Sequence, residues 1–192
     1  MELEKMIKEV EDVLSPKRFR HSLGVMKRME ELAKQYNVDI ETAQKIGITH
    51  DMAKEMTDEE MLKYAQDHHI EVDEIEKEIP SLLHGKIAAD MTKKRYHFTI
   101  EMQKAICYHT TGNPHMDLLA KLLFIADKTE ENRKYIDLEK EKALANTNLN
   151  LSMISLLDES LRYTIQKGSF IHPDSIMTRN ALLKEIKVTK EK

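Results

Sequence analysis

Apolar residues recur at helical spacing along most of the chain, in segments that begin at recognisable helix caps. Ser15 and Pro16 are typical of the N-cap and the first position of a helix. Phe19, Leu23 and Met26 then follow at the spacing of one helix face. With 5 glycines and 4 prolines among 192 residues, few positions interrupt such segments. The sequence therefore predicts an all-α fold.

Several later segments repeat this pattern. Asp39 is a potential cap for a helix over "DIETAQKIGITHDMAKEM", and Thr57 and Glu60 are spaced as a capping box. Further helices are predicted over "SLLHGKIAADMTKKRY", "TIEMQKAICYHTTGNP" and the strongly apolar "MDLLAKLLFIADKTEENRKY". A helical hairpin broken near "KGSFIHPD" completes the chain. The length suits one domain over residues 1–192, with a C-terminal helical extension over about residues 138–192.

Charge and hydropathy exclude several classes of function. The net charge of -4 is spread along the chain, so we expect no nucleic-acid partner, which would require a basic face. The N-terminal residues lack the apolar centre of a signal peptide, and the one cysteine cannot form an internal disulfide. No apolar run approaches the roughly 18 to 20 residues that span a bilayer. We therefore expect a cytoplasmic protein without a membrane partner.

Four predicted helices carry a histidine at or near the apolar face, and two aspartates hold comparable positions. A buried carboxylate without a partner is costly, and several together repel one another unless cations lie between them. A metal cluster would remove this cost. The candidate metal ligands are His21, His50, Asp51, His84, His109 and Asp127.

Helix geometry indicates how these side chains could share two ions. Adjacent helical residues point about 100° apart, so His50 and Asp51 cannot both aim at one point, but they can straddle two metals. Asp51 would then bridge an ion held by His21, His50 and Asp127 and a second ion held by His84 and His109. Imidazole and carboxylate ligands suit Fe, Mn, Ni or Zn, and the missing thiolates argue against a structural zinc site.

Taken singly, each of these residues has an ordinary structural interpretation. A lone histidine on an apolar face is usually a hydrogen-bonded core residue, and a lone inward aspartate is usually a cap or an ion-pair partner. Cys107 is interpreted as a packing residue. The remaining histidines of the polar stretches are expected in solvent; they are His68, His69, His97 and His115.

Local motifs around these residues resemble a known family. The order of His21, the "HD" pair, His84, His109 and Asp127 resembles the HD-domain metal-dependent phosphohydrolase superfamily. The segments "KRFRHSLGV", "HDMAK", "LLHGKIAA", "AICYHTTG", "FIADKTEENR" and "IHPDSIMTRN", between residues 17 and 180, are similar to the bacterial YqeK family. The resemblance implies a single HD domain that cleaves diadenosine tetraphosphate symmetrically into two ADP, by attack of a metal-bound hydroxide at a di-iron type site. Thr49 stands where leucine is commoner in that family, and we expect little effect because residue 49 is not a ligand.

Residues near the ligands are candidates for handling the substrate. Lys54 lies one turn after His50, where its ammonium could hold a phosphate, so Asp51 and Lys54 are the expected catalytic residues. Arg133 could clamp a phosphate or pair with Glu130. The end of the His109 helix either contacts phosphates or forms an ordinary turn; its residues are Thr110, Thr111 and Gly112.

Two other functions remain open at this stage. One is an HD-type phosphohydrolase of nucleoside mono- or triphosphates, and the other is a non-catalytic nucleotide-binding helical module. The sequence also leaves open the oligomeric state, with a homodimer as one alternative, and whether His172 and Arg179 reach the substrate.

Overall fold

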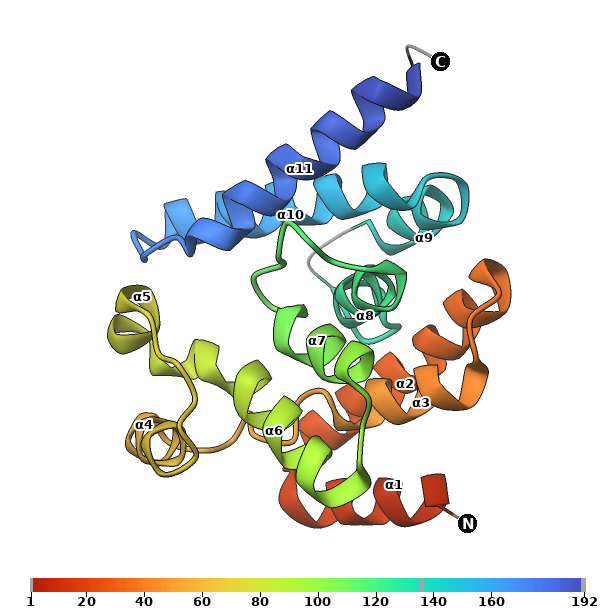
Figure 1. Cartoon of the computed structure of the whole chain (residues 1–192). Helices are drawn as coiled ribbons and strands as arrows, with labels where there is room; N and C mark the ends of the chain where they lie inside the picture. The colour runs from red at the N-terminus through yellow and green to blue at the C-terminus, as the bar shows by residue number, and fades with distance from the viewer. Residues whose placement is uncertain (1, 135–136, 191–192) are drawn as a thin grey trace.

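The computed structural model describes residues 2–134 and 137–190, and over these ranges it contains helices and no strand. This confirms the predicted all-α class (Figure 1). The elements are α1 (Glu2–Val13), α2 (Pro16–Tyr36), α3 (Ile40–Thr49), α4 (Asp58–Asp67), α5 (Glu74–Glu78), the 3₁₀ turn η1 (Pro80–Leu83), α6 (His84–Tyr96), α7 (Ile100–Tyr108), α8 (Leu118–Thr129), α9 (Leu138–Thr147), α10 (Leu149–Gln166) and α11 (Pro173–Lys190).

The predicted helix starts are confirmed. The Asp39 side chain accepts the Thr42 N–H at 2.7 Å and caps α3. Thr57 and Glu60 form the reciprocal capping box of α4, with N–H···O distances of 2.7 and 3.2 Å. Ser15 holds the N-cap position of α2 with Pro16 directly after it, although the serine side chain makes no capping bond.

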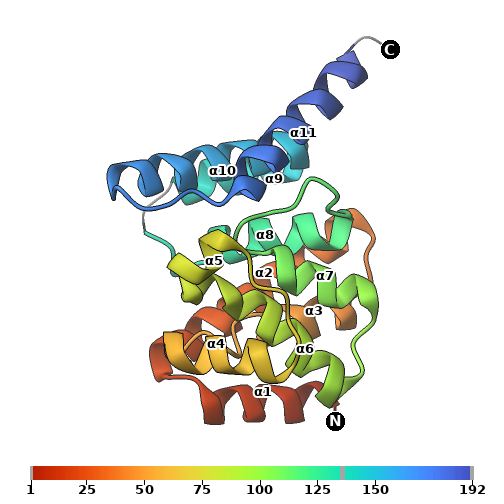
Figure 2. The same cartoon turned by 60° about the vertical axis from the view of Figure 1, so that its left-hand side comes forward.

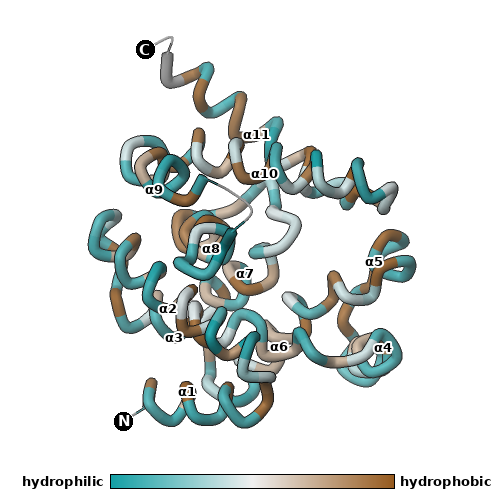
Figure 3. Tube along the Cα trace, turned by 180° about the vertical axis from the view of Figure 1, so that it is seen from behind, coloured by the Kyte–Doolittle hydropathy of each residue, from teal (hydrophilic) through white to brown (hydrophobic). Residues whose placement is uncertain are grey.

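Helix α8 is the centre of the molecule. It packs against α2, α7 and α10, and Figure 3 shows it as one of the most hydrophobic segments of the trace. Five consecutive residues of α8 are fully buried: Leu122, Leu123, Phe124, Ile125 and Ala126. Because α8 is covered on several sides, polar side chains near its end are held in a largely dry environment.

Helices α9, α10 and α11 form a layer over α8, on the side away from α1 (Figure 2). The beginning of α11 is attached to the loop after α7, where the Ser175 hydroxyl donates to the Thr111 carbonyl at 2.9 Å. In the same loop Gly112 adopts a left-handed conformation with φ of 77° directly beneath Thr178. The beginning of α11 is therefore fixed to the segment that follows His109.

Three helices end earlier than predicted, and one of them is α8, which stops at Thr129 although its predicted range continued beyond residue 130. The helix expected over residues 39–56 stops at Thr49, and His50, Asp51 and the next residues form successive turns. The His50 ring contributes to this ending, because its Nδ1 lies 2.8 Å from the Gly47 carbonyl oxygen. Likewise α7 ends at Tyr108, so His109 is its C-cap residue. His50, Asp51 and His109 are thus presented from helix ends.

No helix among the described residues combines the length and the apolar character that a membrane crossing requires.

The contact between Gly112 and Thr178 predicts a measurable difference between two glycine variants. A Cβ at residue 112 would lie 2.8 Å from the Thr178 hydroxyl, whereas a Cβ at Gly168, with φ of 63°, meets nothing within 4 Å. Gly168→Ala should lower the free energy of unfolding by about 1 kcal/mol, because backbone strain acts alone. Gly112→Ala should lower it by about 2–4 kcal/mol, because crowding against Thr178 adds to the strain. Urea unfolding of both variants measures the difference; equal losses would mean that α11 does not press on this loop.

Candidate metal centre

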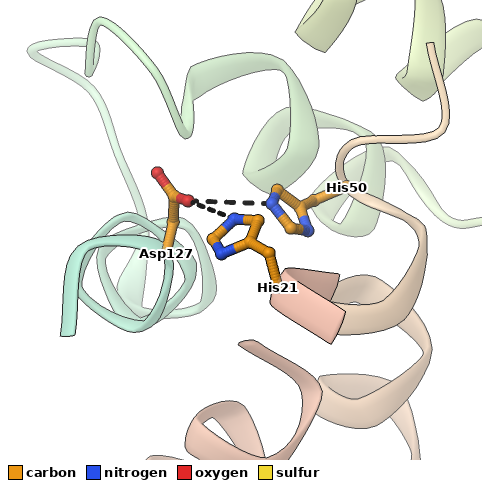
Figure 4. A group of neighbouring side chains, drawn as sticks. All are labelled: His21, His50 and Asp127. Atoms are coloured by element: carbon orange, nitrogen blue, oxygen red, sulfur yellow. Dashed lines mark ion pairs between the residues drawn. The ribbon is translucent and has the colours of Figure 1, made fainter. Parts of the chain in front are cut away.

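The six predicted ligand side chains converge from five helices. His21 comes from α2, His50 and Asp51 follow α3, His84 begins α6, His109 follows α7 and Asp127 belongs to α8. Figure 4 shows His21, His50 and Asp127 directed toward one another from separate segments. His50 and His84 are fully buried, Asp51 and His109 are 2% exposed, and the Asp127 side chain is 14% exposed. The arrangement brings all six together in the interior.

Hydrogen bonds fix the orientation of three imidazole rings. In His50, His84 and His109, Nδ1 lies 2.6–2.8 Å from the carbonyl oxygen of the residue three positions earlier. A carbonyl oxygen only accepts hydrogen bonds, so each Nδ1 carries the proton and each Nε2 presents a lone pair to the centre. This is the tautomer and the orientation that a metal-ligating histidine requires.

The Nε2 atoms that result have few partners from the protein: Lys54 Nζ lies 3.2 Å from that of His84, and the Thr110 hydroxyl lies 3.1–3.2 Å from those of His109 and His84. Nε2 of His50 is buried and makes no hydrogen bond to any described residue. Nε2 of His84 and Nε2 of His109 lie 3.0 Å apart, so two lone pairs face each other. Such a contact is unfavourable unless a cation or a proton lies near both atoms. The donor set therefore fits divalent metal ions.

The Asp51 carboxylate lies between two pairs of histidines. Its Oδ1 is 3.4 Å from Nε2 of His84 and 3.6 Å from Nε2 of His109. Its Oδ2 is 3.7 Å from Nε2 of His50 and 3.9 Å from Nε2 of His21. Each carboxylate oxygen thus faces a different pair, which is the arrangement expected of a bridging ligand.

Asp127 completes the side of the cluster that contains His21 and His50. Its Oδ1 lies 3.0 Å from Nε2 of His21 and 3.8 Å from Nε2 of His50 (Figure 4). Within the cluster, two triads have ligand atoms that all lie within 4.8 Å of one another: His21, His50 and Asp127, and His50, Asp51 and His109. The cluster therefore contains two overlapping groups that could each hold a cation.

Burial and charge set the protonation of the cluster. Burial alone would raise the pKa of Asp51, but its electrostatic interaction with His50 and its polar contacts with His109 and His84 hold that pKa well below its ordinary value. For Asp127, burial is similarly outweighed by the charges of Lys128 and Arg133, so its pKa is also well below its ordinary value. Burial lowers the pKa of His109 to about 4. At neutral pH the aspartates are ionised and His109 is neutral, as metal ligands must be.

A glutamate that the sequence placed near the site orients His21. Glu130 is 2% exposed, and its Oε1 lies 3.2 Å from His21 Nδ1. Burial opposes protonation of His21, but hydrogen bonds to Asp127 and Glu130 raise its pKa to about 9. Glu130 thus acts on His21 as the backbone carbonyls act on the other three histidines.

Four cations surround the cluster, and two of them were not predicted. Lys54 Nζ lies 3.2 Å from His84 Nε2, as its spacing suggested. Arg133 contacts Asp127 Oδ1 at 2.6 Å and the Asp127 carbonyl at 2.8 Å, and it lies 3.8 Å from Glu130. The sequence did not predict the other two, which are Arg18, 3.5 Å from Asp51 Oδ2, and Lys128, 3.3 Å from Asp127 Oδ2. The only signal for Arg18 was its position one helical turn before His21.

A cavity of about 770 Å³ adjoins the cluster. Its wall near the cluster includes Thr110, Thr111, Lys128 and Arg133, and the opposite wall includes residues 169–172 between α10 and α11. The Thr110 hydroxyl lies 3.1 Å from His109 Nε2. Gly112, by contrast, is buried beneath Thr178 and is not among the residues that line the cavity.

The remaining sequence candidates lie in different surroundings. His172 lines the cavity, and its Nε2 is 2.8 Å from an Asp73 carboxylate oxygen. Arg179 pairs with Asp158 of α10. Cys107 is partly buried, and burial raises the pKa of its thiol to about 11, in agreement with a packing role. The histidines expected in solvent are exposed: His68, His69, His97 and His115.

Comparison with known proteins identifies similar chains. Residues 18–132 match the family model of the HD domain. The chain is 34% identical to a protein of Halalkalibacterium halodurans and 30% identical to one of Bacillus subtilis, in each case over 95% of this chain and 98% of the relative; both are named symmetrical bis(5'-nucleosyl)-tetraphosphatase. A crystal structure from Clostridium acetobutylicum, described as a predicted HD superfamily hydrolase involved in NAD metabolism, aligns with a TM-score of 0.91 at 32% identity, covering 95% of this chain and 97% of that chain.

The raised pKa of His21 predicts that metal binding releases a proton. With a pKa of about 9, His21 is protonated in the metal-free protein at pH 7.5, and it must lose that proton to act as a ligand. Calorimetric titration with Zn²⁺ in two buffers of different ionisation enthalpy should show release of about one proton, and affinity should rise as the pH approaches 9. His21→Asn provides the control and should remove this proton. Metal binding to the natural chain without proton release would exclude His21 as a ligand.

Proposed function

The chain belongs to the HD domain family, and we propose that it is a metal-dependent hydrolase that cleaves diadenosine tetraphosphate symmetrically into two molecules of ADP. The proposal is supported by relatives that carry the name of this activity and match nearly their whole length. The main structural support for a two-metal reaction is the position of Asp51, because each of its two carboxylate oxygens faces a different pair of histidines.

We propose that these residues hold two divalent transition-metal ions. His21, His50 and Asp127 would bind one ion, His84 and His109 the other, and Asp51 both. Iron is the proposed metal, and the same ligands also suit manganese, nickel and zinc. Such a pair of ions lowers the pKa of a coordinated water molecule and neutralises negative charge on a phosphoryl group.

The cations of the chain would hold the polyphosphate. Lys54 is largely buried beside His84, and Arg133 lies between Asp127 and the cavity. Burial disfavours the charged form of Lys54 and lowers its pKa, although Asp51 and Asp127 oppose this effect. The negative charge of a phosphate chain would be attracted to both side chains. The hydroxyls of Thr110 and Thr111 add neutral donors at the same wall of the cavity.

The cavity would take one nucleoside diphosphate half of the substrate. Its volume of about 770 Å³ lies within the range of small-molecule sites, and its wall carries Tyr163 and Phe170 along with polar groups. With that half seated beyond Arg133, the central phosphates of the dinucleotide reach the ligand cluster. This placement accounts for cleavage at the midpoint rather than next to a nucleoside.

Hydrolysis of nucleoside mono- or triphosphates is the alternative within the enzyme class, because the same cluster suits many phosphate esters. The names of the relatives favour the dinucleotide. A binding module without catalysis is less well supported, because binding alone does not require six converging ligands.

Symmetrical cleavage has a distinct product pattern. Metal-loaded protein incubated with diadenosine tetraphosphate in heavy-oxygen water should give ADP alone, with one heavy oxygen in half of the ADP molecules, since water attacks one of the two central phosphorus atoms. Chromatography and mass spectrometry measure both quantities. Equal amounts of AMP and ATP would contradict the proposed position of cleavage, and hydrolysis confined to mononucleotides would favour the alternative substrate class.

A further inference from the structure

Lys128 is a buried cation to which the proposed reaction assigns no part. The residue is 8% exposed and lies on α8 directly after Asp127. An ammonium group in a dry interior is costly unless its donors are satisfied. Its surroundings therefore indicate what it does.

The Lys128 ammonium has three neighbours, which match its three N–H donors. Nζ donates to the His109 main-chain carbonyl at 3.1 Å and lies 3.3 Å from Asp127 Oδ2. It also lies 3.8 Å from the centre of the Phe124 ring, a cation–π contact. These three contacts with the protein account for the buried ammonium group without a substrate phosphate.

Because of the contact with Lys128, the two oxygens of the Asp127 carboxylate have different partners. Oδ1 faces His21 at 3.0 Å and Arg133 at 2.6 Å, whereas Oδ2 is held by Lys128. Holding Oδ2 fixes the rotation of the carboxylate and leaves Oδ1 directed at the histidines. A ligand that is fixed in this way binds a metal ion without first losing rotational freedom.

The contact with His109 reaches the other half of the cluster. The His109 carbonyl follows the last turn of α7, where carbonyl groups lack partners within the helix. His109 Nε2 lies beside Asp51 Oδ1 and His84, whereas Asp127 lies beside His21 and His50. One ammonium group therefore connects a residue of each proposed metal pocket.

We propose that Lys128 is a positioning residue that sets Asp127 and His109 at a fixed separation and thereby determines the affinity and coordination of the metal ions. This inference rests on the proposed metal-dependent hydrolysis but not on the identity of the nucleotide. Because Lys128 also lines the cavity, a direct contact with substrate is the competing role.

The experiment compares lysine variants of the full chain. Lys128→Met removes the charge and the donors at similar volume, and Lys128→Arg keeps both. Lys121→Met is the matched control, because Lys121 lies on the same helix but contacts Asn150 and Glu185. Lys54→Met tests a cation that is proposed to hold phosphate. Metal-free protein is titrated with Co²⁺ against a chelator, the visible absorption of bound Co²⁺ is recorded, and kcat and KM are measured with saturating metal.

Lys128→Met should weaken Co²⁺ binding by about 10- to 100-fold, shift the absorption bands and lower kcat with little change in KM. Lys128→Arg should restore most of the affinity, Lys121→Met should match the natural chain, and Lys54→Met should change KM or kcat without changing the absorption. If Lys128→Met unfolds, Lys128→Gln is measured in its place.

The proposal would be overturned in favour of substrate contact if Lys128→Met kept the Co²⁺ affinity and absorption of the natural chain but had a raised KM. Unfolding of every Lys128 variant would assign Lys128 to folding alone. Co²⁺ affinity does not depend on which nucleotide is cleaved. A failure of the positioning role can therefore be distinguished from a failure of the proposed function.

Discussion

The site depends on one costly arrangement, two carboxylates and four imidazoles gathered in an interior from which water is largely excluded. Asp51 is 2% exposed, and both of its oxygens face histidine nitrogen atoms. Such a cluster is unfavourable by itself, because burial disfavours charge and because the lone pairs of His84 and His109 face each other. Divalent cations held by these residues would turn these unfavourable contacts into coordination bonds. The fold must therefore be stable enough to hold the ligands together before any ion arrives, and the covered apolar helix α8 is central to that stability.

Helix ends are what make the convergence possible. His50 and His109 are the C-cap residues of α3 and α7, and His84 is the first residue of α6. At a helix end the backbone changes direction, so adjacent residues such as His50 and Asp51 can approach one centre, which they could not do from within a helix. The carbonyl groups near these ends also accept the Nδ1 protons and so fix the ring tautomers. Secondary structure and ligand chemistry thus share the same hydrogen bonds.

The sequence predicted much of this because caps and helical spacing are local signals. Asp39 and the Thr57–Glu60 box act as predicted, and the four histidines and two aspartates do come together. Helix α1 was not predicted, since only Met6 and Val10 of its residues are buried and charged residues dominate the segment. The early ends of α3 and α7 were also missed, because they involve hydrogen bonds from the histidine rings themselves. Lys128 and the cavity could not be predicted, as both depend on how α7, α8 and the C-terminal helices pack.

In the proposed two-metal site, Asp51 serves both ions whereas Asp127 serves one. The most direct test is metal titration of Asp51→Asn and Asp127→Asn beside the natural chain, with elemental analysis of the bound ions after gel filtration. An asparagine keeps one accepting oxygen and loses the charge, so it cannot bridge two cations as a carboxylate does. Asp51→Asn should lose affinity for both ions, and Asp127→Asn should lose mainly one. Two ions bound to Asp51→Asn with the affinity of the natural chain would contradict the bridging role and the two-metal site built on it.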